Sequence, residues 1–302
     1  MKITQLQLLK ILLSNGLNIS EAAKQTYVVQ SAVSRQLSLL EDELGMPLFI
    51  RKGKRLVEPT PLCIDICKEI DHLELAMDNI RAVADDHRDA RIGELRLATT
   101  HMQAKYFLPE VIKQFREKYP KVKIHILQGN PTQLVDMLHK READIAVCTE
   151  ELAEHSDLVK NKCYDWNHAL IVPSGHPLAK GKLSLERIAE FPLLTYVFGF
   201  TGRTKIHQTF KDKGLEMDVT FSATDTDVIK SYVRLGFGAG IISRMAYSEQ
   251  NDSDLVLRDL SEFFPSSTTS VAYVKSKFMK SYLHDCVDLL VEHGRKTMPS
   301  VS

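Results

Sequence analysis

The sequence predicts a mixed α/β protein built from a small helical N-terminal domain, one connecting helix and a two-lobed α/β domain. Three observations support this fold class. Helical apolar spacing with capping signals runs to Gly45, an apolar seam runs through residues 66–84, and strand-like and helix-like segments alternate after Gly93. A chain of 302 residues can hold two or three domains, and 44% apolar and 26% charged residues are typical of a globular protein.

Residues 1–60 are expected to form a winged helix-turn-helix DNA-binding domain. Asn18 and Glu21 are spaced as a capping box that opens a short second helix, and Gly45 ends a third helix over residues 30–44. The first helix is predicted by apolar residues at helical spacing, namely Ile3, Leu6, Leu9, Leu13 and Leu17. The buried stripe of the third helix is expected to be Ala32, Val33, Leu37, Leu40 and Leu44.

The predicted DNA-contacting groups lie on the third helix and on a basic hairpin that follows it. The exposed side of the helix carries hydrogen-bonding groups suited to base edges and phosphates, namely Gln30, Ser31, Ser34 and Arg35. Gly53 can turn the hairpin, whose basic tip displays Arg51, Lys52, Lys54 and Arg55. Residues 1–60 carry eight Lys/Arg against five acidic residues, a local charge of +3 in a chain of zero net charge. Double-stranded DNA is the expected partner; the alternative is a solvated amphipathic helix beside an ordinary basic loop.

The stretch AAKQTYVVQSAVSRQLSLLEDELGMPLFIRKGKRL, residues 22–56, resembles the winged helix-turn-helix of LysR-type transcriptional regulators nearly end to end. The resemblance implies binding to an operator or promoter, and RNA polymerase as a further partner. The family usually has Ser at the position of Val29. The third helix is therefore expected to lack a hydroxyl N-cap, at a cost of about 1 kcal/mol.

Residues 61–90 are expected to form a dimerising linker helix. Its apolar residues are spaced by four and three in turn, as in an a/d seam: Ile66, Ile70, Leu73, Met77 and Ile80. A helix-turn-helix that reads one half-site usually needs a twofold partner, so a homodimer or homotetramer is expected. The alternative is a helix that packs on its own domain.

Residues 91–302 are expected to form a two-lobed domain, with lobe I from about 91–162 and 267–302 and lobe II from about 163–266. Alternating strands and helices indicate mostly parallel sheets. Strands are predicted at 94–100, 122–128, 143–148, 168–173, 193–196, 218–223, 239–243 and 269–274. Helices are predicted at about 104–118, 132–140, 184–190, 202–213, 225–235 and 278–293.

Hydroxyl and amide side chains gather where these strands end. Thr100 and Gln103 follow one strand, Thr149 follows another, and Thr201 follows a third and is a good N-cap for the next helix. A fourth strand ends in QGNPTQ. Because ligands bind at the carboxyl ends of parallel strands, these neutral donors are expected to share a cleft for a small anion. The alternative is that each Thr caps its own helix.

Three stretches of this domain, LATTHMQAKYFLPEVIKQF, VFGFTGR and ATDTDVIKSYVRLGFGAGII, resemble the LysR-type regulators of sulfur assimilation. The resemblance implies a periplasmic-binding-protein-like fold and an effector such as sulfate, O-acetylserine or N-acetylserine. The matching cleft positions are Thr100, Gln103, Thr149 and Thr201, with Trp166 as a neighbour. Met102 stands where those regulators have a second Thr. Loss of that hydrogen bond lowers sulfate affinity about ten- to a hundredfold, or the pocket serves a less polar effector.

No catalytic, cofactor or metal site is predicted, because the sequence has no nucleophile–base motif, paired-carboxylate signature or phosphate loop. The alternatives are a LysR-type regulator of another pathway with a different effector, or a thiol redox-responsive regulator using Cys63 and Cys67, which lie four residues apart. A solute-binding protein is disfavoured by the attached winged helix. A cytoplasmic location without a membrane partner is expected, since no apolar run is long enough to span a bilayer and no signal peptide is evident.

Overall fold

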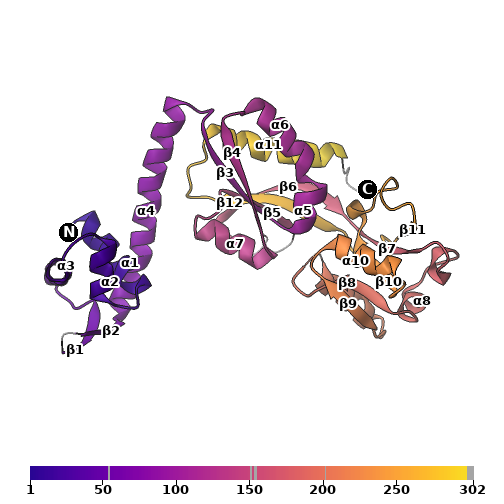
Figure 1. Cartoon of the computed structure of the whole chain (residues 1–302), viewed down its shortest axis with the longest axis horizontal. Coiled ribbons are helices and arrows are strands. Elements are labelled where there is room, and N and C mark those ends of the chain that lie inside the picture. Colours follow the sequence, from indigo (N-terminus) through magenta and orange to yellow (C-terminus); the bar gives the residue numbers. More distant parts are fainter. Residues whose placement is uncertain (54, 150–151, 153–154, 201, 298–302) are drawn as a thin grey trace. The chain divides into compact units, whose positions relative to one another are not determined.

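The computed structural model describes residues 1–53, 55–149, 152, 155–200 and 202–297. The chain forms two compact units, Met1–Ala82 and Val83–Ser302, which are described separately (Figure 1). Within the described ranges, no helix has the length and apolar character needed to cross a membrane.

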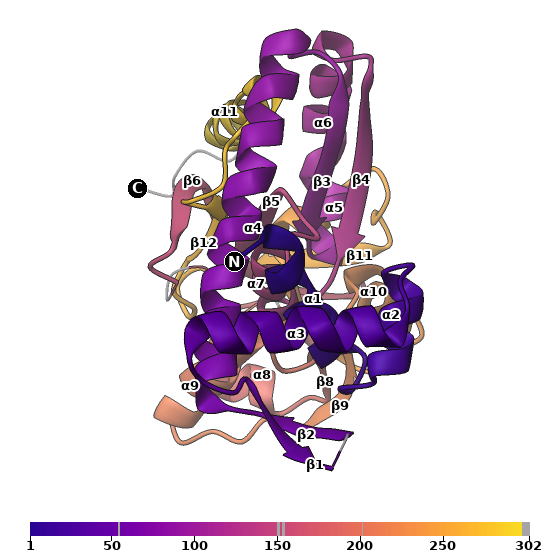
Figure 2. The same cartoon turned by 90° about the vertical axis from the view of Figure 1, so that its left-hand side faces the viewer.

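The first unit contains three short helices, a two-stranded hairpin and the first part of a long helix. Its elements are α1 (Ile3–Ser14), α2 (Ile19–Gln25), α3 (Gln30–Leu44), β1 (Phe49–Lys52), β2 (Arg55–Pro59) and the start of α4 (Pro61–Arg88). Figure 2 shows α3 across one face of this unit with the hairpin below it. The core is closed by buried leucines from α1 and α3, including Leu9, Leu12, Leu37 and Leu40. The unit is a helix-turn-helix with a hairpin wing.

The ends of the second and third helices lie where the sequence places them. Asn18 caps α2, because its Oδ1 accepts hydrogen bonds from the backbone nitrogens of Ser20 and Glu21 at 3.0 and 3.2 Å. The Glu21 carboxylate pairs with Lys24 at 2.7 Å. Gly45 ends α3 in the left-handed conformation, with φ of +70°, which costs a glycine little because it has no Cβ.

The apolar face of α1 differs from the predicted stripe. Ile3 opens the helix and is 43% exposed. Leu13 and Leu17 are only partly buried, because α1 ends at Ser14 and Leu17 takes a left-handed φ of +64°. The buried face consists of Leu6, Leu8, Leu9 and Leu12.

The linker helix α4 changes character along its length. Ile70 is 2% exposed and belongs to the core of the first unit, and Ile66 and Leu73 pack partly against the same core. Met77 is half-buried, and Ile80 is 70% exposed. The first half of the helix therefore packs on its own domain through Ile66, Ile70 and Leu73, and the exposed residue of the predicted seam, Ile80, lies toward the C-terminal end.

Lobe I of the second unit is built on a five-stranded sheet in the order β4-β3-β5-β12-β6. Its strands are β3 (Gly93–Thr99), β4 (Val122–Gln128), β5 (Ile145–Thr149), β6 (Leu158–Trp166) and β12 (Ser267–Val274). Its helices are α5 (His101–Tyr106), α6 (Leu108–Lys118), α7 (Pro131–His139) and α11 (Ser281–Thr297). β3 pairs in parallel with β4 and β5, whereas β12 lies antiparallel to both β5 and β6.

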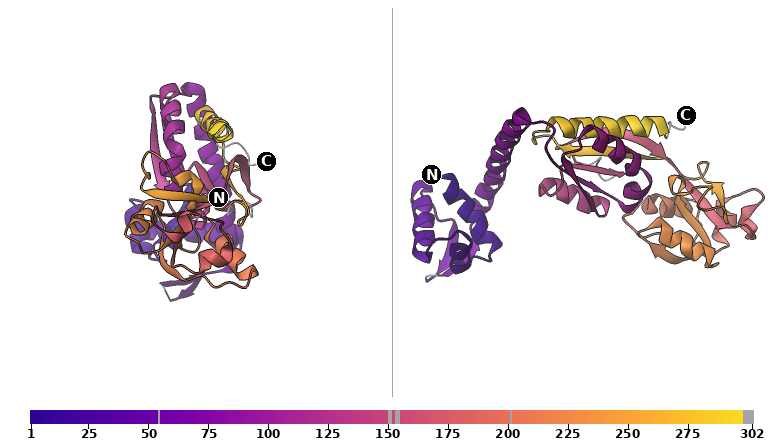
Figure 3. Two further views of the ribbon diagram at one scale, coloured as in Figure 1. Left: turned by 90° about the vertical axis from the view of Figure 1, so that its right-hand side faces the viewer. Right: turned by 45° about the horizontal axis from the view of Figure 1, so that its top comes forward.

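Alternate residues of β3 face the two sides of the lobe I sheet. Leu95 and Leu97 pack with α6 and α11, and Ala98 packs with α7. Helices therefore cover both faces (Figure 3), which buries the apolar residues of the neighbouring strand β5 on both sides of the sheet.

Lobe II has a second five-stranded sheet, in the order β11-β7-β10-β8-β9. Its strands are β7 (His168–Pro173), β8 (Leu193–Tyr196), β9 (Val219–Ala223), β10 (Ala239–Ser243) and β11 (Leu255–Asp259). Its helices are α8 (Leu185–Ala189), α9 (Arg203–Asp212) and α10 (Thr226–Arg234), with single 3₁₀ turns at Pro177–Ala179 and Arg244–Ala246. α8 and α9 pack on one face of the sheet and α10 on the other.

Each of the eight strands predicted for this domain is present, and two further strands, β6 and β11, were not predicted. Because β6 belongs to the lobe I sheet up to Trp166, which pairs with Ser267, the chain crosses into lobe II at Asn167 and not at residue 162. The single helix expected over 104–118 is two helices, α5 and α6, which meet at Phe107.

Candidate functional site

The predicted DNA-contacting side chains of α3 lie together near its N-terminal end. Gln30, Ser31 and Arg35 are exposed, and Ser34 is half-buried. The Gln30 amide donates a 2.7 Å hydrogen bond to Ser20 Oγ on α2, which holds it beside the turn of the helix-turn-helix.

The turn before α3 contains an exposed apolar segment around Val29, the residue that replaces the hydroxyl N-cap. Tyr27 is 96% exposed and has a φ of +56°, and Val28 and Val29 are 47% and 68% exposed. Val29 is the N-cap of α3 and makes no side-chain capping bond, as expected from the missing hydroxyl. The backbone N–H of Ala32 already bonds to the Val29 carbonyl at 2.9 Å, so only the N–H groups that precede it at the start of α3 are left for solvent or an anion.

An ion pair between Arg51 and Glu41 connects the hairpin wing to α3. Arg51 contacts Glu41 with 2.5 Å between Nη2 and Oε2, and the same carboxylate accepts a 2.9 Å hydrogen bond from the backbone nitrogen of Leu48. Lys52 and Arg55 are exposed and form no ion pair within the described part of the chain. The remaining predicted wing residue, Lys54, lies outside the described residues.

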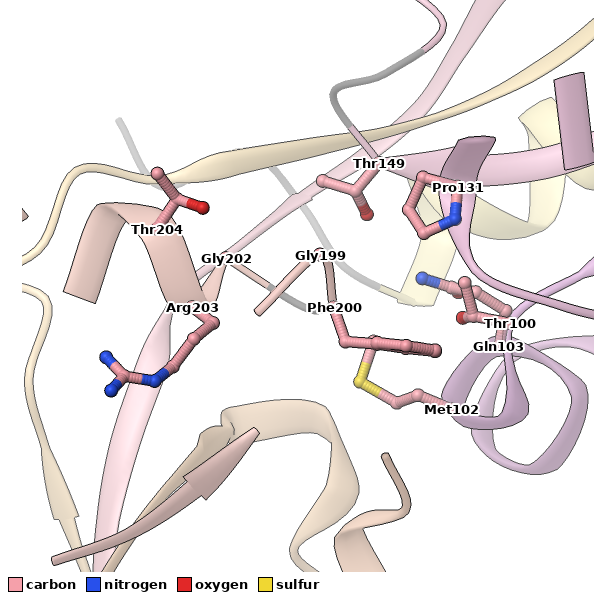
Figure 4. Close-up of a pocket in the computed structure, with 10 residues that line it drawn as sticks. All are labelled: Thr100, Met102, Gln103, Pro131, Thr149, Gly199, Phe200, Gly202, Arg203 and Thr204. Carbon is pink, nitrogen blue, oxygen red and sulfur yellow. The ribbon is translucent and has the colours of Figure 1, made fainter. Parts of the chain in front are cut away.

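The second unit has a small pocket between its lobes, with a volume of about 110 Å³. Figure 4 shows the lobe I residues on one side and the loop before α9 on the other. The pocket is lined by Thr100, Met102, Gln103, Pro131, Thr149, Gly199, Phe200, Gly202, Arg203 and Thr204. No carboxylate is among these described lining residues, so the pocket suits a small neutral or anionic ligand.

Gln103 is the most firmly held polar group of the pocket. Its Nε2 donates to Thr269 Oγ1 at 3.2 Å, its Oε1 accepts from the Tyr164 hydroxyl, and Thr269 lies 3.2 Å from the Thr149 hydroxyl. Gln103 is 1% exposed, so both ends of its amide are fixed by buried neighbours. Thr269 and Tyr164 come from β12 and β6, and sequence reasoning missed them because no local pattern connects them to α5.

Thr100 is the polar group left open. It is the N-cap of α5, yet its hydroxyl makes no capping hydrogen bond. By contrast, Asn130 at the end of β4 caps α7 through a 2.8 Å bond from the backbone nitrogen of Gln133. Helix capping therefore accounts for Asn130 at the end of β4, but it does not account for the Thr100 hydroxyl.

The loop before α9 brings backbone close to the pocket. The N-cap of α9 is Gly202 rather than the expected Thr201, which lies outside the described residues. Gly202 has a φ of +69°, and a Cβ there would lie 2.8 Å from the His168 ring and 3.8 Å from Trp166. Trp166 is 4% exposed and lies behind Gly202 instead of lining the pocket.

Met102 and Phe200 form an apolar wall of the pocket. Met102 is 6% exposed, and Figure 4 shows its sulfur against the Phe200 ring. The cation of Arg203 is largely buried, stacks 4.6 Å from the centre of the Phe198 ring, and has no carboxylate partner in the described ranges. Burial lowers the pKa of Arg203. Its guanidinium points away from Thr100 in Figure 4, so it contributes positive potential without a direct contact.

The helix that carries Gln103 also contacts lobe II. Lys105 and Tyr106, at the end of α5, both bind Asp227 of α10, and the Tyr106 hydroxyl donates to it at 2.7 Å. Burial alone would raise the pKa of Asp227, but the hydrogen bonds from Lys105 and Tyr106 outweigh it, and the pKa lies below its usual value. One six-residue helix thus joins the pocket to the contact between the lobes.

The predicted redox pair has the features of a structural thiol pair. Cys63 is fully buried and Cys67 half-buried, and both are free cysteines. Burial raises the pKa of both thiols, that of Cys63 to about 12. Thiolate is the reactive form, so this environment disfavours oxidation.

A winged helix-turn-helix with exposed polar groups on α3, followed by a two-lobed domain with a small polar pocket, defines a ligand-responsive DNA-binding regulator. Family models agree: residues 3–63 match the bacterial regulatory helix-turn-helix protein of the lysR family, and residues 88–295 match the LysR substrate binding domain. The chain belongs to the LysR family of transcriptional regulators. It is therefore a regulator and not an enzyme.

Individual relatives cover nearly the whole chain. It is 44% identical to the HTH-type transcriptional regulator CysB of Haemophilus influenzae, over 97% of this chain and 91% of that one. It is 42% identical to the regulator SsuR of Burkholderia cenocepacia, over 97% and 96%. The solved cofactor-binding domain of the Cbl transcriptional regulator aligns with a TM-score of 0.64 and 39% identity, covering 69% of this chain and 95% of that one. The resemblance predicted from the sequence is confirmed.

Proposed function

We propose that this regulator controls sulfur-assimilation genes in response to a small anionic effector, such as sulfate, O-acetylserine or N-acetylserine, bound between the two lobes. The observation that carries the proposal is the polar side of the pocket. Thr100 offers a hydroxyl without a capping bond, beside Gln103 and Thr149, and no described lining residue is acidic. Uncharged donors in a partly dehydrated pocket favour an anion without a buried counter-charge. The similarity to CysB, SsuR and Cbl supports the sulfur pathway.

The experiment is a thermal-shift titration of the full chain with sulfate, thiosulfate, O-acetylserine and N-acetylserine. A ligand at a hundred times its Kd stabilises the folded state by about 2.7 kcal/mol, so at least one of the four is expected to raise Tm in a concentration-dependent way. No shift with any of them at millimolar concentration would rule out this effector class.

A second effector class is favoured by the apolar wall. Met102 from lobe I and Phe200 from the loop before α9 both line the pocket, so an anion that carries a short apolar group fits better than bare sulfate. We expect Met102→Thr to raise sulfate affinity about tenfold or more, because a hydrogen bond to a charged group contributes about 1.5–3 kcal/mol. Unchanged sulfate affinity in this variant would remove Met102 as the source of selectivity.

The DNA-binding half of the proposal assigns base and phosphate contacts to α3 and the wing. Arg35 is exposed on α3, and a good guanidinium contact to a base is worth about 1–3 kcal/mol. Arg35→Ala is expected to lower operator affinity more than tenfold without changing Tm. The matched control is Lys68→Ala, which removes an exposed cation from α4 and is expected to leave affinity unchanged. Full binding by the Arg35 variant would refute the assignment.

The assembly is proposed to be a dimer or tetramer located in the cytoplasm, with RNA polymerase as a further partner at the promoter. Within α4, burial leaves Met77 and Ile80 as the seam residues available to a second copy, since Ile70 belongs to the core of its own unit. Ile80→Asp is expected to shift the chain toward monomer in analytical ultracentrifugation.

A further inference from the structure

Two imidazoles and a carboxylate meet on the surface of lobe I, apart from the effector pocket. His139 is the last residue of α7, and His155 and Asp157 lie in the connection from β5 to β6. Their potential ligand atoms all lie within 4.8 Å of one another. His139 Nε2 is 2.8 Å from Asp157 Oδ2, and the two imidazole rings lie 5.6 Å apart, edge to face.

We propose that His139, His155 and Asp157 bind a transition-metal ion of the Zn²⁺, Co²⁺ or Ni²⁺ class. Two imidazole nitrogens with one carboxylate oxygen form a ligand set that suits these ions and leaves a coordination position for water. Ca²⁺ and Mg²⁺ are disfavoured, because they require oxygen ligands. The three ligands come from two separate elements, so the ion joins the end of α7 to the start of β6.

The geometry requires only small movements. Neighbouring ligand atoms around a tetrahedral zinc are about 3.4 Å apart, from Zn–N and Zn–O distances near 2.1 Å. The side chains of His139 and Asp157 are 39% and 53% exposed, so they can rotate by the ångström or so that closure needs. A metal would replace the present hydrogen bond between His139 and Asp157, and the imidazole would bind as its neutral form.

The backbone beneath the cluster is held in place. The carbonyl oxygen of Asp157 accepts a 2.9 Å hydrogen bond from the backbone nitrogen of Lys275, and the carbonyl of His155 accepts one from Leu158 at 3.3 Å. The negative end of the α7 dipole lies at His139 and favours a cation there. The backbone that carries His155 and Asp157 is thus fixed before any ion binds, so only side-chain rotations add to the entropic cost of binding.

The test is a titration of the metal-free full chain with Co²⁺, followed by visible absorption and then by displacement with Zn²⁺. One Co²⁺ per chain is expected, with d–d bands and without the near-ultraviolet thiolate band of a cysteine site. His139→Ala and His155→Ala are each expected to weaken binding at least tenfold. His125→Ala, which removes an exposed imidazole from β4, is the matched control and is expected to bind as the unmodified chain does.

Three results would overturn the proposal: no Co²⁺ binding below millimolar concentration, a thiolate band, or full affinity in both histidine variants. Asp157→Asn keeps the size of the side chain and removes its charge, and is also expected to weaken binding. Far-UV circular dichroism of the metal-free variants separates loss of the site from loss of the fold. The outcome is independent of the effector, because the three ligands do not line the pocket.

Discussion

The central strands of lobe I have paired polar groups at one end and an unpaired polar group at the other. Where β5 begins, Asp144 is 5% exposed and is closed by Arg96, at 3.0 Å, and by Lys277, at 2.6 Å. Where β3 ends, the Thr100 hydroxyl makes no capping hydrogen bond and borders a pocket that no described carboxylate lines. A buried charge must be paired and hydrogen-bonded for the fold to be stable. A ligand, in contrast, binds to a hydrogen-bonding group that the protein leaves without a partner. The comparison separates a structural polar site from a binding site within one sheet.

The largest loss of stability is expected at the Asp144 end of the sheet. Asp144→Ala leaves two cations facing a buried gap, and breaking a buried ion pair of this kind costs about 3–5 kcal/mol. Partial exposure of Arg96 puts the expected value near the lower limit, about 3 kcal/mol. The free energy of unfolding in urea measures it. A loss below about 1 kcal/mol would mean that the two ends do not differ as described.

The same end gives a pH signature. Burial would raise the pKa of Asp144, but Lys277 and the hydrogen bonds from Arg96 lower it below its usual value. The carboxylate therefore stabilises the folded chain above about pH 4, the ordinary Asp range, and this stabilisation is lost as pH falls through the lowered pKa. Urea unfolding between pH 3 and 7 is expected to show this acid loss in the unmodified chain and a weaker one in Asp144→Ala.

The open end predicts a smaller change, confined to binding. Thr100→Val keeps the shape of the side chain and removes a hydroxyl that makes no capping bond. Effector affinity is expected to fall about ten- to a hundredfold, the cost of one hydrogen bond to a charged group, with Tm and basal DNA binding unchanged. Calorimetry and operator binding provide the two readouts. A lower Tm would place Thr100 with the structural polar groups instead.

The smallest effect is expected where the pocket meets lobe II. Asp227→Asn weakens an exposed ion pair to Lys105, worth about 0.2–1 kcal/mol. If α5 links the pocket to the lobe contact, this variant changes effector affinity two- to fivefold with little change in Tm. Lys113→Ala, at another exposed pair of lobe I, serves as the control.

Much of this arrangement follows from local sequence. Local sequence alone predicts the helix caps at Asn18 and Gly45. It also predicts the strand ends at Thr100 and Thr149. β6 was missed because its alternation is polar, with exposed or half-buried residues between buried ones. The partners of Gln103 were missed for a different reason: Thr269 is 166 residues away, and only the completed sheet brings the two together. The N-cap at Gly202 also depends on packing, because it requires the close approach of His168.

The insertion of lobe II into lobe I has a consequence for synthesis on the ribosome. β12 lies between β5 and β6 in the lobe I sheet, yet it follows the whole of lobe II in the chain. The winged unit and lobe II can therefore fold while the first part of lobe I still waits for its missing strand. Thr269, whose hydroxyl contacts Gln103 and Thr149, is part of that strand and is synthesised with it. A nascent chain that has emerged only to β11 thus has the means to find DNA before it can sense any ligand.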